Sequence, residues 1–154
     1  MTFSRGAPGE GAAVRERVAW VRDRIAAAER RAGRPPGSVT LVAVSKRQPL
    51  DRILEARAAG CAVFGENFVQ EAEGKIPAVP GAEWHLIGKL QGNKVRKAVS
   101  LFSWIQTADS AKRVGEIARC AVAAGKAVPV LLEVNVGAEA SKAGIPPADL
   151  RAVV

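Results

Sequence analysis

Residues 39–64 read VTLVAVSKRQPLDRILEARAAGCAVF, and this stretch contains one strand–helix–strand unit. Val39–Ser45 is a nearly continuous apolar run, which is typical of a parallel strand buried on both faces. The pattern then predicts a helix over Pro49–Ala59, because proline is favoured in a first turn and Gly60 follows the last periodic residue. Cys61–Phe64 is expected to form the next strand.

The same alternation continues on both sides of this unit. Further strands are expected at Glu83–Ile87, Ser103–Thr107 and Val128–Val136. Further helices are expected at Asn67–Ile76, at Gln91–Val99, from a cap at Asp109 or Ser110 to Ala124, and after Pro146. A first helix over Ala12–Ala32 has an apolar stripe (Val14, Val18, Val21, Ile25) and a solvated face that includes Glu29. Residues 1–11 are expected to form a flexible start.

Strands and helices that alternate at this spacing predict an α/β fold with a parallel sheet. Two architectures fit: a doubly wound sheet, and a TIM barrel, which needs eight strands and ~250 residues. A length of 154 residues favours the doubly wound sheet. Neither nucleotide-binding fingerprint of such sheets follows the first strand, however, and periodicity alone cannot choose between the two.

Composition narrows the class of protein. With 154 residues, 48% hydrophobic and 25% charged, the chain has the balance of one soluble globular domain. It has no apolar run of ~18 residues that would span a membrane and no visible secretory signal. Cys61 and Cys120 fit no metal or redox spacing, so a cytoplasmic location is expected. The net charge of +8 is diffuse and comes without a recognition motif, which disfavours nucleic acid as a partner.

Functional residues of parallel α/β folds gather at the carboxyl ends of the strands. Lys46 directly follows the first strand, where partial desolvation favours the neutral amine that forms a Schiff base with an aldehyde. A lysine that extends into solvent is the competing interpretation. His85 alternates with Trp84 on the third strand, so the two face opposite sides of the sheet. His85 is either a packed core residue or part of a site.

Other polar residues follow the remaining strands. Asn67 either caps the next helix or contacts a ligand, and Asn135 lies at the end of the fifth strand. No cluster of histidine, cysteine and carboxylate residues has metal-ligand spacing, so no metal site is predicted. A basic cluster near the helix at 91–99 is either a solvated face or an anion site; it consists of Lys89, Lys94, Arg96 and Lys97.

Four segments, in order, resemble the pyridoxal phosphate homeostasis protein family, the YggS-like and PROSC-like proteins. They are Leu41–Lys46, Phe64–Glu71, Glu83–Gly88 with Leu90–Lys94, and Val134–Val136 with Glu139, Ser141, Lys142 and Gly144. The resemblance extends over about residues 12–154. It implies a fold-type III barrel like the alanine racemase N-terminal domain, preceded by one extra helix.

The resemblance also implies a cofactor and a role. Pyridoxal 5′-phosphate (PLP) would be held as a Schiff base on Lys46, with Asn67, His85 and Asn135 as further cofactor-binding residues. The implied function is vitamin B6 homeostasis without an established catalytic reaction, with PLP-dependent apo-enzymes as candidate partners. The alternative is a PLP-dependent enzyme acting on amino acids, but the chain lacks the tyrosine that racemases of this fold use.

The resemblance implies a longer barrel than this chain provides. Residues 12–154 are expected to form a partial barrel domain with about five of eight βα units, as in a C-terminally truncated family member. In the family, the later strands supply much of the phosphate-binding cup. We therefore expect weak PLP affinity from this length of chain.

Overall fold

A computed structural model describes residues 6–9, 11–139 and 143–153 of the chain. The strands are β1 (Val42–Val44), β2 (Val63–Glu66), β3 (Glu83–Leu86), β4 (Trp104–Ala108) and β5 (Val130–Leu132). The α-helices are α1 (Val14–Arg31), α2 (Leu50–Ala58), α3 (Val69–Lys75), α4 (Val95–Leu101), α5 (Ala111–Ala123) and α6 (Leu150–Val153). Short 3-10 turns are η1 (Ile76–Ala78), η2 (Gly92–Lys94) and η3 (Pro147–Asp149). The predicted succession of strands and helices is confirmed, although most elements are shorter than expected.

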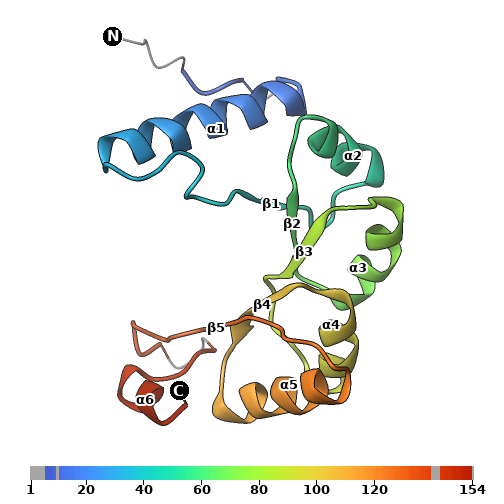
Figure 1. Cartoon of the computed structure of the whole chain (residues 1–154), viewed down its shortest axis with the longest axis vertical. Coiled ribbons are helices and arrows are strands. Elements are labelled where there is room, and N and C mark those ends of the chain that lie inside the picture. The colour runs from blue at the N-terminus through green and yellow to red at the C-terminus, as the bar shows by residue number, and fades with distance from the viewer. Residues whose placement is uncertain (1–5, 10, 140–142, 154) are drawn as a thin grey trace.

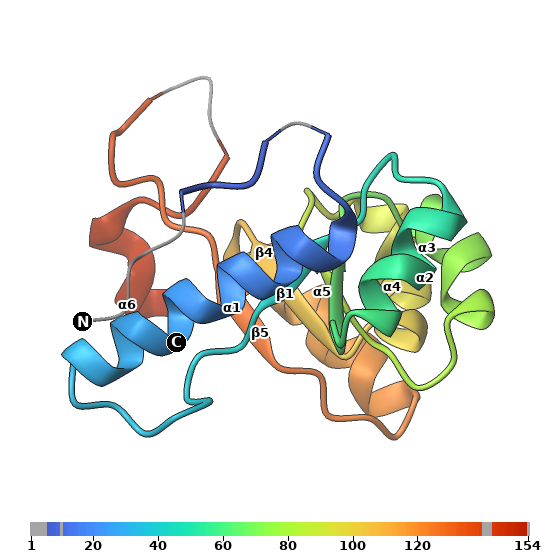
Figure 2. The same ribbon diagram turned by 90° about the horizontal axis from the view of Figure 1, so that it is seen from above.

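The strand order distinguishes between the two architectures. The five strands are parallel and lie in the order β1-β2-β3-β4-β5. A doubly wound sheet would reverse this order at a switch point, whereas a barrel is built by adding each strand beside the previous one. Both views place α2, α3 and α4 on the same side of the strands, and α6 on the other side (Figures 1 and 2). The sheet is therefore of the barrel type, and the preference that chain length gave to the doubly wound sheet is wrong.

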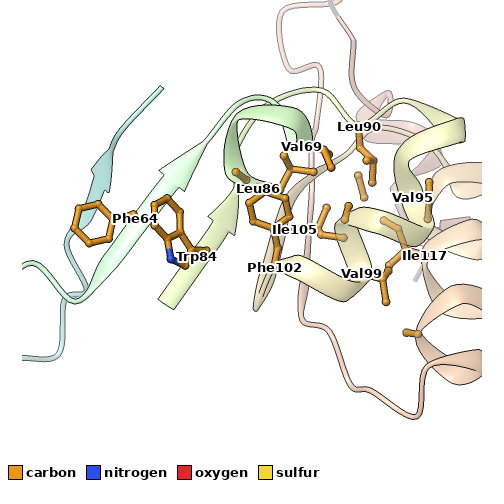
Figure 3. Packing of buried hydrophobic residues seen from close by; sticks show 14 of the residues in the cluster. Phe64, Val69, Trp84, Leu86, Leu90, Val95, Val99, Phe102, Ile105 and Ile117 are labelled. Atoms are coloured by element: carbon orange, nitrogen blue, oxygen red, sulfur yellow. The ribbon is translucent and has the colours of Figure 1, made fainter. Parts of the chain in front are cut away.

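The hydrophobic core lies between the sheet and the helices that follow its strands (Figure 3). Phe64 of β2 and Trp84 of β3 stack with ring centroids 5.3 Å apart. Leu86, Phe102 and Ile105 extend this layer toward α4 and α5 and are almost fully buried. The core thus fixes which face of each strand points toward the helices.

The first strand differs from the prediction. Only Val42–Val44 pairs with β2, and Val44 is 54% exposed rather than buried. Alternate residues of a strand point to opposite faces, so Ala43 packs against the core while Val44 lies on the face turned away from it. The expectation of burial on both faces is therefore wrong for β1.

Glu29 was expected on a solvated face of α1, but it is buried. Its carboxylate accepts hydrogen bonds from the backbone N–H groups of Gly37 and Val39, at 3.0 and 2.8 Å. These bonds lower the pKa of Glu29. The side chain thus ties the loop between α1 and β1 back onto the helix.

Several smaller predictions concern single residues. Ser110 is confirmed as the cap of α5, because its Oγ accepts a hydrogen bond from Arg113 N at 3.2 Å. Cys61 and Cys120 are both free thiols, and burial raises the pKa of Cys61. Among the described residues, no helix has the length and apolar character needed to cross a membrane. The expected flexible start at 1–11 lies partly outside the described residues, and Ser141 and Lys142 lie wholly outside them.

Candidate functional site

One row of residues crosses the sheet on the face turned away from the core. The strand register pairs Val44 with Gly65, Gly65 with His85, and His85 with Trp104. A Cβ at Gly65 would lie 2.9 Å from Ile87 Cδ1 and 3.1 Å from Val42 Cγ1, so Gly65 occupies a closely packed position on this face. The row provides a floor below the carboxyl ends of β1 to β4.

Lys46 lies in the turn directly after β1. Its side chain is exposed, which differs from the partial desolvation expected from the sequence. In the described part of the chain, Lys46 has no hydrogen-bond or ion-pair partner. Its amine is therefore open to a reagent or ligand that approaches the carboxyl ends of the strands.

The imidazole of His85 is held at both ring nitrogens. Nε2 lies 3.0 Å from Glu83 Oε1, and Nδ1 lies 2.9 Å from Gln106 Nε2. The Trp104 ring packs beside it, with centroids 5.8 Å apart. Because the amide nitrogen of Gln106 can only donate, Nδ1 accepts and Nε2 carries the proton that Glu83 accepts. His85 is thus a fixed, almost fully buried ring.

Asn67 follows β2, and its backbone lies close to that of Gly88, which follows β3. A Cβ at Gly88 would lie only 2.3 Å from Asn67 O, so only glycine allows this contact. Asn67 does not cap α3, because the N-cap residue is Phe68 and no side chain bonds there. Asn67 instead lines a cavity of about 680 Å³, together with Phe68, Lys89 and others. Of the two predicted roles, the contact with a ligand is the one that this placement leaves open.

Asn135 stabilises its own loop. Its Nδ2 donates to Glu139 O at 2.9 Å, and its Oδ1 accepts from Glu139 N at 3.3 Å. Gly144 approaches the same segment, since a Cβ there would lie 2.8 Å from Asn135 N. The structure therefore connects Asn135 with the segment that follows β5, and among the described residues no hydrogen bond joins its side chain to Lys46, Asn67 or His85.

The basic cluster is partly neutralised by neighbouring carboxylates. Lys97 Nζ lies 2.6 Å from Glu73 Oε1, and Lys89 Nζ lies 4.0 Å from Asp109 Oδ2. Both lysines are exposed. These pairs favour the interpretation as a solvated face.

Sequence analysis missed a buried charge cluster beneath Lys46. Glu66, at the end of β2, has no exposed side-chain surface, and its Oε1 lies 2.7 Å from Lys75 Nζ. Lys75 Nζ also donates to Glu71 Oε2 at 3.0 Å. Glu71 and Lys75 are four residues apart on α3, which is a detectable helical pairing, but nothing in the sequence connects that pair to Glu66. Among the described residues, no group of three histidine, cysteine or carboxylate side chains could hold a metal ion.

The three charges affect one another's ionisation. Burial raises the pKa of Glu66, although hydrogen bonds from Lys75 and Ser45 oppose the shift. Hydrogen bonds from Arg47 N and Lys75 lower the pKa of Glu71. Burial acts to lower the pKa of Lys75, but its two carboxylate partners outweigh burial and raise it. Lys75 is therefore held in its charged form between the two carboxyl groups.

A comparison with known families identifies the fold. The family model for the alanine racemase N-terminal domain matches residues 17–154. The chain belongs to this family. Among its relatives, the pyridoxal phosphate homeostasis protein of Pseudomonas aeruginosa is 41% identical over 142 residues, covering 91% of this chain and 62% of the relative. The protein of the same name from Escherichia coli is 43% identical over 138 residues, covering 86% and 59%. The resemblance to pyridoxal phosphate homeostasis proteins is thus confirmed.

Solved structures of the alanine racemase N-terminal domain type agree with the fold. PipY of Synechococcus elongatus, in a structure with PLP bound, is 44% identical with a TM-score of 0.70, covering 86% of this chain and 61% of PipY. An unknown protein from Bifidobacterium adolescentis is 40% identical with a TM-score of 0.79, covering 91% and 62%. Histidine racemase from Leuconostoc mesenteroides, at 17% identity and a TM-score of 0.65, shares the fold. The chain spans about 60% of the length of the homeostasis proteins that it matches.

Proposed function

We propose that this chain binds PLP at the carboxyl edge of its sheet, through the amine of Lys46, and takes part in PLP homeostasis. The observation that carries the proposal is the exposed amine of Lys46 in the turn after β1, which has no partner among the residues that the structure describes. The relatives support it, because they are named pyridoxal phosphate homeostasis proteins and PipY has been solved with PLP bound.

The residues around Lys46 fit such a ligand. PLP supplies an electrophilic aldehyde, and a primary amine is the group that adds to it. The row Val44–Gly65–His85 lies below the edge, and strand spacing places Val44 and His85 roughly 10 Å apart across the sheet. Gly65, in the middle, has no side chain, and the apolar side chains of Ile87 and Val42 pack closely against it. The floor beside Lys46 is therefore apolar and closely packed, a surface against which the flat ring of PLP can lie.

The other three proposed cofactor-binding residues take different roles. Both nitrogens of His85 are engaged by Glu83 and Gln106 and its ring is almost fully buried, so His85 acts by packing below the ligand rather than through a new hydrogen bond. Asn67 offers a side-chain amide at the neighbouring strand end. The amide of Asn135 is bonded to Glu139, so Asn135 acts by ordering the segment after β5.

A trapping experiment tests this function. The chain is incubated with PLP and reduced with borohydride, and the modified residue is mapped by mass spectrometry. We expect the adduct on Lys46 and its loss in Lys46→Ala, while the matched variant of another exposed lysine, Lys112→Ala, retains it. Equal labelling of many lysines, or no adduct on Lys46, would contradict the proposal.

We further infer PLP-dependent apo-enzymes as recipients and the cytoplasm as the place of action. The two free thiols, Cys61 and Cys120, are compatible with a reducing compartment. No nucleic-acid partner is proposed, because Lys89 and Lys97 pair with neighbouring carboxylates. Faster reactivation of an apo-enzyme by the PLP-loaded chain than by an equal concentration of free PLP would support the transfer role.

A further inference from the structure

The buried charge cluster, which consists of Glu66, Glu71 and Lys75, forms hydrogen bonds with the residues on both sides of Lys46. Ser45 is buried, and its Oγ donates to Glu66 Oε1 at 2.7 Å. The carbonyl oxygen of Ser45 accepts a hydrogen bond from Lys75 Nζ at 2.8 Å. Ser45 is thus held through its side chain and its backbone by two members of the cluster.

The residue on the other side of Lys46 is held by the third member. Arg47 N donates to Glu71 Oε2 at 3.0 Å. Arg47 has φ 57°, in the left-handed region that a non-glycine residue seldom adopts without support. The carboxylate of Glu71 provides that support, because its bond to the backbone N–H is made in this conformation.

Lys46 itself has no side-chain partner in the described part of the chain, so its position depends on its backbone. The two flanking residues are anchored to Glu66, Lys75 and Glu71, and Lys75 bridges the two carboxylates. The cluster therefore connects the end of β2 and the helix α3 to both sides of one exposed lysine.

We propose that Glu66, Glu71 and Lys75 are positioning residues that fix the turn at residues 45–47 and so direct the Lys46 amine toward PLP. This inference rests on the proposed function, because it assigns PLP as the ligand of Lys46. The three side chains act through the backbone of Ser45 and Arg47 and make no contact with the ligand. Small displacements of a reacting group cause large losses of rate, so the effect on the reaction is expected to exceed the effect on folding.

The experiment compares two carboxylates of the same helix. Glu71→Ala removes the bond to Arg47 N, whereas Glu71→Gln keeps a side-chain oxygen that can accept it. Glu73→Ala is the matched control, because Glu73 is also on α3 and is also paired with a lysine, Lys97, but lies away from the turn. The readouts are the hydrogen-exchange rate of the Arg47 amide by NMR and the rate at which PLP is trapped on Lys46.

In Glu71→Ala we expect Arg47 exchange to rise and trapping to slow, each by roughly tenfold. Glu71→Gln is expected to recover most of both, and Glu73→Ala to behave as the wild type, with all three variants folded by circular dichroism. A second variant, Glu66→Gln with Lys75→Met, removes the fully buried carboxylate together with its ammonium partner and leaves the partly exposed Glu71 carboxylate bonded to Arg47 N. It is expected to slow trapping, because Ser45 loses its bond from Lys75.

The outcomes separate this inference from the proposed function. Unchanged exchange and trapping in Glu71→Ala would overturn the positioning role while leaving PLP binding intact. Equal losses in Glu71→Ala and Glu73→Ala would also overturn it, since they would indicate a general effect on α3. No adduct on Lys46 in the wild-type chain would overturn the proposed function and this inference with it.

Discussion

At the scale of single residues, Glu29 shows how a charged side chain replaces secondary structure in holding a loop. The segment between α1 and β1 has few backbone hydrogen bonds of its own, and the Glu29 carboxylate accepts two, from Gly37 N and Val39 N. A hydrogen bond between Ser38 Oγ and the same carboxylate, at 3.4 Å, completes the contact. Because these bonds favour the ionised form, they lower the pKa of Glu29 below its ordinary value of 4.5.

The sign of the pH dependence follows from this shift. A carboxyl group whose pKa is lower in the folded state stabilises the fold above its unfolded pKa, and that stability is lost as the pH falls through the folded pKa. We expect Glu29→Gln to lower the Tm by a few degrees near neutral pH, and the difference from the wild type to shrink at acid pH. Thermal unfolding at several pH values measures this. Glu55→Gln, which alters an exposed pair with Arg52, should change the Tm little; a constant deficit for Glu29→Gln at all pH values would contradict the linkage.

At the scale of elements, the ends of β2 and β3 approach each other through Gly88. An added Cβ would lie 2.3 Å from Asn67 O and 2.5 Å from Asn67 Cα, and these are backbone atoms that cannot rotate away. The carbonyl of Gly88 is also fixed, since it accepts a hydrogen bond from Thr107 Oγ1 at 2.6 Å. We therefore predict that Gly88→Ala lowers the free energy of unfolding by about 1–3 kcal/mol, as measured by urea denaturation.

The control for this prediction is another glycine that becomes alanine. A Cβ at Gly74, in α3, would meet nothing within 4 Å, and alanine is the better helix former. Gly74→Ala should leave stability unchanged or raise it by about 0.5–1 kcal/mol. If the two variants were equally stable, the close approach at Gly88 would not constrain the sheet.

The elements themselves were largely predictable from local signals. Local signals placed α2 and α5 within two residues of their observed bounds. These signals are a proline at the start of α2, a hydroxyl cap at the start of α5, and a glycine after the end of each helix. The strands were predicted too long at 39–45 and 128–136, because apolar runs continue where strand pairing stops. The buried contact of Glu66 with Lys75 was not predictable, since it depends on how α3 packs against β2.

At the scale of the whole molecule, periodicity left the strand order open. A parallel α/β repeat is compatible with either architecture, and chain length pointed to the wrong one. Only the resemblance carried by segments such as Leu41–Lys46 indicated a barrel. The order of the strands in the sheet is shared by the family, and the local sequence pattern does not specify it. The local pattern did place Lys46 just after a strand, as observed. It could not show that the side chain is exposed, because exposure depends on how the surrounding elements pack.

The sequential order leaves two edges to the sheet. Among the described residues, β1 pairs only with β2, and β5 (Val130–Leu132) pairs only with β4, although Val134, just after β5, forms a parallel bridge with Ile145. Apolar side chains lie exposed on both edge strands, since Val44 is 54% and Leu131 is 47% exposed. Unpaired strand edges with apolar side chains favour pairing with another copy. The net charge of +8 opposes such pairing by repulsion, and salt screens that repulsion.

We therefore predict that the chain self-associates more strongly as salt is raised, and that Leu131→Lys weakens this association by roughly tenfold, which corresponds to about 1.4 kcal/mol. The new charge lies on β5, where a paired strand would have to bury it. Sedimentation velocity over a range of protein and salt concentrations measures the effect. Val122→Lys adds the same charge at an exposed apolar position of the helix α5, so it separates a strand-edge effect from a general gain in repulsion. Equal weakening by both substitutions would assign the association to net charge and not to the edge of the sheet.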